Sequence, residues 1–111
     1  MTTPELYTYS ALIVEILDGD TVRANFDLGM YVSVVSQKVR LEGVWAPEKK
    51  QEHGEHMTQY LRSLIYAERV IIRTRKDKQQ EKWGRWLGQI YLLDGANVNE
   101  LVNEEIKRCT T

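Results

Sequence analysis

The sequence predicts an α+β or mainly β domain in which three strands, a helix, two strands and a second helix follow one another. Three observations predict this order. Residues 11–17, 21–26 and 31–42 carry the β-rich or alternating pattern of half-buried strands. Residues 57–65 change to the i, i+3, i+4 spacing of an amphipathic helix. Residues 70–74 and 86–93 return to the strand pattern before a short final helix.

Turn-forming residues separate these predicted elements. Residues 18–20 read Asp-Gly-Asp and are predicted to turn the chain between the first two strands, and residues 27–29 between the second and third. Residues 43–50 are predicted as a loop that contains a proline. Asn97, with Glu100 three residues later, predicts the N-cap of the final helix.

Length and composition predict one soluble domain over residues 1–111. The single cysteine, Cys109, excludes an internal disulfide and a zinc site of paired cysteines, and it is consistent with a reducing compartment. The sequence shows no signal peptide and no apolar run of membrane-spanning length. We therefore expect a cytoplasmic protein, with a monomer favoured and no membrane partner.

The charge of the chain is unevenly distributed. The net charge of −1 argues against a protein that coats nucleic acid nonspecifically. The first half is acidic, however, and a basic run follows it. This arrangement suits a site that holds a cation on one side and a phosphate on the other, or simply a solvated surface. The basic residues of this run are Arg69, Arg73, Arg75, Lys76, Lys78, Lys82 and Arg85, opposed by Asp77 and Glu81.

Three short motifs could carry chemistry. The carboxylates of Asp18 and Asp20 offer the oxygen ligands that Ca²⁺ and Mg²⁺ prefer, although Asp-Gly-Asp is also a common hairpin turn. Arg40 could bind a phosphate in bidentate fashion, and Glu48, on a proline-fixed loop, could act as a general base on water. The alternative is a surface strand that ends in a loop. In residues 82–85, an aromatic side chain beside an arginine could stack on a base, or the segment could be a rim turn with a packed tryptophan.

The order and spacing of these motifs resemble the staphylococcal nuclease family over residues 11–108. The resemblance rests on D-G-D-T-V, then R-L-x-G-V-x-x-P-E, a helix, W-G-R, and a final V-N-x-L-V helix. It implies an OB-fold five-stranded β-barrel with two or three helices. It also implies hydrolysis of phosphodiester bonds in DNA or RNA with a divalent cation, Ca²⁺ first and Mg²⁺ or Mn²⁺ as alternatives.

The resemblance also implies the roles of eight residues. Asp20 would be a direct metal ligand, Asp18 a second carboxylate, and Ala46 a ligand through its backbone carbonyl. Arg40 and Arg85 would bind and polarise the scissile phosphate. Glu48 would activate or orient the attacking water. The two residues expected to contact a terminal phosphate and nucleotide are Lys82 and Trp83.

Trp45 departs from the family pattern, because it stands where the family has an aspartate that binds the metal through its side chain. Indole offers only an N–H donor and cannot bind a hard cation. The metal could bind weakly through the remaining aspartates and water, Glu42 or Glu48 could fill the gap, or the site could be inactive with the arginines still holding phosphate. The alternative function is therefore a noncatalytic module that binds nucleic acid or nucleotides.

A third alternative is a small interaction protein that keeps only the scaffold. The short form of the chain would suit a protein of phage-like origin. Four other residues with ionisable side chains are expected at the surface without a role. They are His53, His56, Glu104 and Glu105, and Cys109 is expected in a fraying tail.

Overall fold

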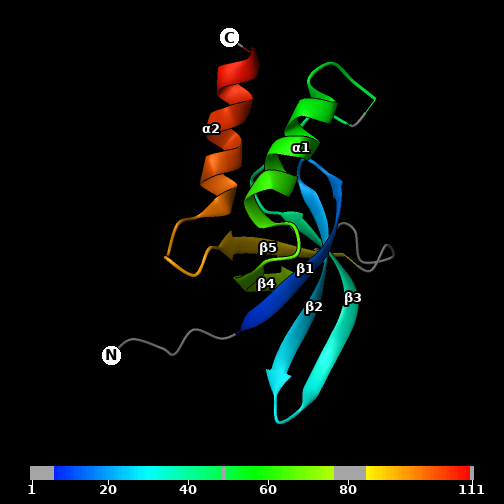
Figure 1. The fold of residues 1–111 in the computed structure, drawn as a ribbon, viewed down its shortest axis with the longest axis vertical. Helices are drawn as coiled ribbons and strands as arrows, with labels where there is room; N and C mark the ends of the chain where they lie inside the picture. Colours follow the sequence, from blue (N-terminus) through cyan, green and yellow to red (C-terminus); the bar gives the residue numbers. More distant parts are fainter. Residues whose placement is uncertain (1–6, 49, 77–84, 111) are drawn as a thin grey trace.

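Five strands and two helices form in the order that the sequence patterns predicted (Figure 1). The computed structural model describes residues 7–48, 50–76 and 85–110, and it includes all their side chains except those of residues 76, 85 and 110. The elements are β1 (Thr8–Asp18), β2 (Thr21–Gly29), β3 (Val32–Leu41), α1 (Gly54–Ile65), β4 (Arg69–Lys76), β5 (Arg85–Tyr91) and α2 (Val98–Thr110). The strands close into a barrel in the order β1-β2-β3-β5-β4, which confirms the five-stranded barrel.

The barrel closes where β3 and β5 meet. All neighbouring strands are antiparallel except this pair, in which residues 38–41 lie parallel to residues 85–88. At this seam Gly88 is required, because a Cβ atom there would lie 2.7 Å from Cγ1 of Val39 and 3.1 Å from Cγ2 of Ile72. The seam brings β5 beside the strand that carries Arg40, so it helps to position the candidate site.

Alternate residues of the strands fill the barrel, and the apolar stripes of both helices cover one end of it. Helix α1 packs against β1 and α2, and α2 packs against β5, so the helices lie side by side (Figure 1). The helix stripe that the sequence predicted is confirmed by the burial of Met57, Leu61 and Ile65. In the described part of the chain, neither helix is long and apolar enough to span a bilayer.

The N-cap of α2 was predicted correctly, but the far end of this helix was not. The backbone N–H of Glu100 donates to Oδ1 of Asn97 at 3.0 Å. Cys109, which was expected in a fraying tail, lies in α2 and packs partly buried against the core. Glu105, which was expected in solvent, is buried, and its Oε2 lies 2.6 Å from Nε2 of His56. Both errors arise because α2 packs against α1, a contact that the pattern of α2 alone does not reveal.

The β2–β3 hairpin extends past the rest of the barrel (Figure 1). Its turn was predicted at residues 27–29 but lies directly after them, at residues 30 and 31. Residues 27–29 belong to β2, where Oδ1 of Asp27 accepts a hydrogen bond from the N–H of Gly29. The turn is made by Met30 and Tyr31, with φ angles of 55° and 63°. Two consecutive positive φ angles are typical of a type I′ turn, which normally uses asparagine and glycine. Two large exposed side chains therefore occupy a strained turn.

Replacing the turn residues by Met30→Asn and Tyr31→Gly is expected to raise the free energy of unfolding by about 1 kcal/mol. The substitutions relieve the left-handed strain at both positions, while the flexibility of glycine offsets part of the gain. Urea denaturation measures the change. A matched variant with serine at both positions removes the same apolar surface without relieving the strain and should show no comparable gain. Equal stability of the two variants would contradict the strain argument.

Candidate active site

The backbone of the barrel places Asp20 next to Arg40. Asp20 ends the β1–β2 turn, and the following residue, Thr21, is paired with Arg40 in the β2–β3 ladder. The N–H of Leu41 also donates to the carbonyl of Asp20 at 2.8 Å. As a result, Nη2 of Arg40 lies 3.9 Å from Oδ2 of Asp20, and the two side chains are only 18% and 15% exposed. A carboxylate and a guanidinium thus share a half-buried site at one end of the barrel.

Two hydrogen bonds orient the Asp20 carboxylate. Its Oδ1 accepts from the hydroxyl of Thr21 at 3.0 Å, and its Oδ2 accepts from the backbone N–H of Ala46 at 3.3 Å. Burial nevertheless raises the pKa of Asp20 above 3.8, against the lowering effects of Thr21, Arg40 and Ala46, and Asp18 raises it further. The negative charge of Asp20 is therefore only partly compensated by the protein.

Gly19 allows the loop and the helix to approach the turn that carries Asp20. A Cβ atom at Gly19 would lie 2.8 Å from Cβ of Met57 and 2.9 Å from Cβ of Ala46. Because that space is free, α1 and the loop after β3 pack directly on the turn. This packing brings the backbone N–H of Ala46 to the Asp20 carboxylate.

The guanidinium of Arg40 is held by the same loop. Its Nη2 donates to the carbonyl of Val44 at 3.2 Å, and its Cζ lies 5.2 Å from the ring centroid of Trp45. The Trp45 side chain is 72% exposed. The ring is therefore largely in solvent and lies within cation–π distance of the arginine. No sequence pattern predicted this contact or the hydrogen bonds of Thr21 and Val44.

The two glutamates that could replace the missing aspartate lie in different surroundings. Glu42 forms an ion pair with Arg75 of β4, and its oxygen Oε1 also lies 3.5 Å from Nε2 of Gln89. Glu48 is exposed on the loop, where its backbone is fixed by two hydrogen bonds with Gln51. Glu42 is thus engaged at the β4–β5 face, whereas the side chain of Glu48 faces solvent.

Three of the predicted site residues fall on a part of the chain that the structure describes only partly or not at all. Lys82 and Trp83 lie outside the described residues, as does the side chain of Arg85. The backbone of Arg85 is described, and its Cα pairs with that of Lys38, two residues before Arg40 in β3. The structure thus brings Asp20, Arg40 and Ala46 together and places Arg85 on the neighbouring strand.

The candidate oxygen donors for a cation are two carboxylates and one backbone carbonyl. Asp18 lies close enough to Asp20 to affect its pKa, and the carbonyl of Ala46 belongs to the residue whose N–H contacts Asp20. Within the described ranges, however, no group of three or more His, Cys, Asp or Glu side chains could hold a metal ion. A set of two carboxylates with a carbonyl resembles sites that substrate phosphates complete, and not a preformed Ca²⁺ cage.

Replacing Asp20 with asparagine is expected to raise the melting temperature of the cation-free protein at neutral pH by about 2–4 °C. Burial raises the pKa of Asp20 in the folded state above its unfolded value of 3.8. Stability that the wild type has below the unfolded pKa is therefore lost as the pH rises through the folded pKa. The variant cannot ionise and keeps it. Thermal scans in EDTA from acid to neutral pH measure the difference, which should grow toward neutrality.

The matched control for this prediction is Glu104→Gln, which removes one charge from an exposed position. It should leave the melting temperature nearly unchanged. Saturating CaCl₂ or MgCl₂ should stabilise the wild type and not the Asp20→Asn variant. A variant that is less stable than the wild type at every pH would show that the contacts with Thr21 and Arg40 outweigh the burial of the charge.

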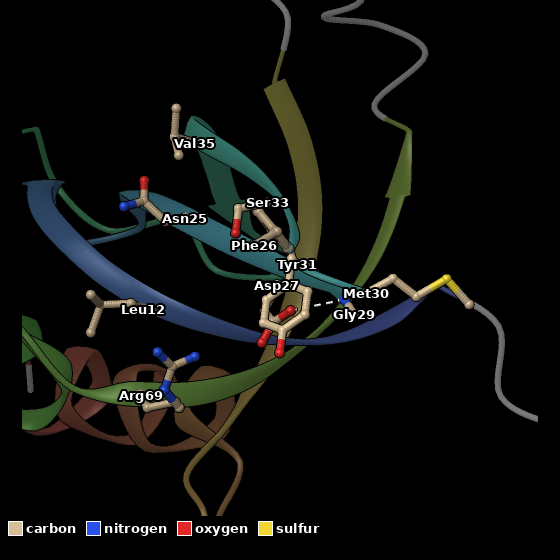
Figure 2. A pocket seen from close by; sticks show the side chains of 10 residues that line it. All are labelled: Leu12, Asn25, Phe26, Asp27, Gly29, Met30, Tyr31, Ser33, Val35 and Arg69. Atoms are coloured by element: carbon tan, nitrogen blue, oxygen red, sulfur yellow. Dashed lines mark hydrogen bonds between the residues drawn. The ribbon is translucent and has the colours of Figure 1, made fainter.

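A hollow of about 610 Å³ lies on the outer face of the β2–β3 hairpin, away from this site. Figure 2 shows Asp27 and Tyr31 of the hairpin on one side of it and Arg69 of β4 on the other. Nη1 of Arg69 donates to the hydroxyl of Ser10 at 3.2 Å. Opposite charges thus face the same hollow, so it offers no cationic surface for a phosphate.

Comparisons with known proteins agree with this fold. Residues 38–105 match the family model described as staphylococcal nuclease homologue. A relative named "Uncharacterized endonuclease" from Escherichia coli O157:H7 is 36% identical over 90 residues, which cover 81% of this chain and 53% of the relative. Protein ParB of Escherichia coli is 31% identical over 80 residues, covering 72% of this chain and 40% of that protein.

A third relative, named "Micrococcal nuclease", comes from Shigella flexneri. It is 30% identical over 91 residues, which cover 82% of this chain and 47% of the relative. The chain thus spans about half the length of the curated relatives that it matches. The family match begins at residue 38, so it includes Arg40 and the loop around Trp45 and Ala46. Together with the closed five-stranded barrel, these matches show that the chain belongs to the family of staphylococcal nuclease homologues.

Proposed function

We propose that this chain is a nuclease domain that hydrolyses phosphodiester bonds of DNA or RNA. The observation that carries the proposal is the half-buried pair of Asp20 and Arg40, held together by the β2–β3 ladder and the loop after β3. A carboxylate that is only partly compensated, beside a fixed guanidinium, offers one place for a cation and one for a phosphate. The nuclease names of two relatives support the same chemistry.

Arg40 would bind the scissile phosphate and stabilise the charge that develops on it. Val44 and Trp45 fix the guanidinium before substrate arrives, so little reorganisation is needed. Arg85, whose backbone lies on the adjacent strand, would supply a second guanidinium. Water attacks phosphorus, the bond to the leaving oxygen breaks, and the carboxylate of Glu48 accepts the proton of the water. The leaving oxygen takes a proton from solvent.

A divalent cation, Ca²⁺ or alternatively Mg²⁺ or Mn²⁺, would be held by Asp18, Asp20 and the carbonyl of Ala46. When bound, it would polarise a phosphoryl oxygen as a Lewis acid. Asp20 would enter this role already oriented by Thr21 and by the N–H of Ala46. Lys82 and Trp83 would contact the nucleotide beside the scissile bond.

The test is degradation of plasmid DNA and of single-stranded RNA with CaCl₂, MgCl₂, MnCl₂ or EDTA. Cleavage that requires a cation and is lost in Glu48→Ala and Asp20→Asn supports the proposal. Glu52→Gln is the matched control for a loop carboxylate and should cleave like the wild type. Absence of cleavage by the wild type with every cation would refute it.

The second candidate function is a noncatalytic module that binds nucleic acid or nucleotides. The contact between Trp45 and Arg40 favours it, because an exposed indole stands where the family has a metal-binding carboxylate. In that case the arginine and the ring would hold phosphate and base together. Binding of an oligonucleotide without cleavage under any cation is the result that distinguishes this function.

A further inference from the structure

A second cavity, of about 290 Å³, lies at the end of the barrel where β1 and β5 begin. We call it the aromatic mouth. Three of its lining residues are aromatic side chains from β1, β2 and β5, and a fourth, Tyr7, stands at the rim with 63% of its surface exposed. The lining residues are Tyr7, Tyr9, Phe26, Leu28, Val34, Gln37, Thr74 and Trp86.

The walls of the aromatic mouth are fixed by contacts within the protein. The rings of Tyr9 and Phe26 meet edge to face, with centroids 5.8 Å apart and an interplanar angle of 86°. The indole N–H of Trp86 donates to Oε1 of Gln37 at 3.1 Å, and Nε2 of Gln37 donates to the carbonyl of Val35 at 3.0 Å. The rings are therefore oriented before a ligand enters, which lowers the entropic cost of binding.

The chemistry of the aromatic mouth suits a neutral planar ring. None of its lining residues among the described part of the chain carries a formal charge. This differs from the hollow of Figure 2, where Asp27 faces Arg69. Aromatic side chains of this kind are the surfaces on which proteins stack the bases of a single strand.

The aromatic mouth and the candidate active site lie at different ends of the barrel, but they share strand β3. Gln37 precedes Arg40 by three residues in β3, a separation of about 10 Å along an extended strand. Trp86 is paired with Val39 across the β3–β5 seam and follows Arg85 directly. The same short ladder thus carries the phosphate-binding arginine and two walls of the cavity, so one flexible strand can reach both.

We propose that the aromatic mouth binds one nucleobase of the strand whose phosphate lies at Arg40. This inference rests on the proposed interaction with nucleic acid, but it does not require cleavage. The volume lies just below the range of about 300–1,000 Å³ that is typical of sites for larger ligands, so it suits one base and not a stacked pair. The base enters between Tyr7 and Trp86 and stacks on the rings.

The first experiment measures binding of a fluorescently labelled single-stranded DNA oligonucleotide in EDTA. Tyr7→Ala should weaken binding by about 5- to 100-fold, the usual effect of losing one stacking partner. Tyr31→Ala, which removes an exposed tyrosine at the hairpin tip outside the aromatic mouth, should bind like the wild type. Unchanged binding by Tyr7→Ala would overturn the inference.

A second measurement avoids variants that could perturb the fold. Titration of the wild type with thymidine 5′-monophosphate should shift the indole N–H resonance of Trp86 and the side-chain amide resonances of Gln37 in a ¹H–¹⁵N spectrum. An abasic oligomer of the same length as the labelled oligonucleotide should leave these resonances unchanged. The Tyr7→Ala variant should bind that abasic oligomer as well as the wild type does. Equal shifts with the abasic oligomer would assign the effect to phosphate and overturn the base site.

These outcomes separate the base site from the nuclease proposal. If no cation supports cleavage but Tyr7→Ala weakens binding, the base site stands without the hydrolysis. The opposite result is cleavage of DNA by the wild type, unchanged oligonucleotide binding by Tyr7→Ala, and no shift of the Trp86 resonance with thymidine 5′-monophosphate. In that case the nuclease proposal stands without the base site.

Discussion

Arg40→Ala is expected to lower the rate of phosphodiester cleavage by about 10²–10³-fold. The guanidinium is fixed by Val44 and Trp45 next to Asp20, so its donors stand ready for the charge that develops on the phosphate. Alanine removes both the charge and the fork of N–H donors. Initial rates on a fluorogenic oligonucleotide at saturating Mg²⁺ or Ca²⁺ measure the loss.

Arg40→Lys is the matched control, because it keeps the charge and loses the bidentate geometry. It should retain more activity than alanine and less than the wild type. Circular dichroism checks that both variants are folded, since Arg40 also balances the charge of Asp20. Equal rates for the wild type and Arg40→Ala would contradict the role of this arginine.

Trp45→Asp is expected to increase the affinity for Ca²⁺ by tenfold or more, because Ca²⁺ affinity rises with the number of charged ligands. Residue 45 directly precedes Ala46, whose N–H already contacts the Asp20 carboxylate. A carboxylate at this position would join Asp18 and Asp20 near the same oxygen donors. Isothermal titration calorimetry measures the affinity, and the Ca²⁺ concentration needed for half-maximal cleavage should fall in parallel.

The matched control is Trp45→Ala, which removes the ring from Arg40 without adding a carboxylate. It should leave Ca²⁺ affinity close to that of the wild type. The double variant Asp20→Asn, Trp45→Asp should lose the gain, since the new ligand acts together with Asp20. If Trp45→Asp binds Ca²⁺ no better than Trp45→Ala, the loop does not direct residue 45 toward the cation.

The sequence predicted the order of the elements better than the turns and the strand contacts that connect them. Alternation and helical spacing predicted all five strands and both helices, because each pattern reflects burial of one face. The tip of the hairpin was misplaced, since Asp27 and Gly29 are good turn residues and Met30 and Tyr31 are poor ones. Closure of the sheet into a barrel depends on the contact of β3 with β5, which no local pattern encodes.

Local patterns pointed to individual residues of the candidate site, but not to the contacts between them. The motif around Asp20 and the arginine at position 40 were visible as residues, and the ladder between β2 and β3 explains why they meet. The orientation of Trp45 was not predictable, because it depends on where the loop places the ring over Arg40. The engagement of Glu42 with Arg75 of β4 is likewise a contact between strands that are remote in sequence.

The short parallel seam also governs when the site can form as the chain folds. The β3 segment that carries Arg40 gains its outer neighbour only when residues 85–88, which lie far along the sequence from it, dock against it. Contacts between such distant segments form slowly, because a long loop must close first. The hairpin that holds Asp20 and Arg40 needs only contacts between neighbouring segments, so it closes a much shorter loop than the docking of Arg85 and Trp86 does. The phosphate site and the aromatic mouth are both finished in the same late docking step.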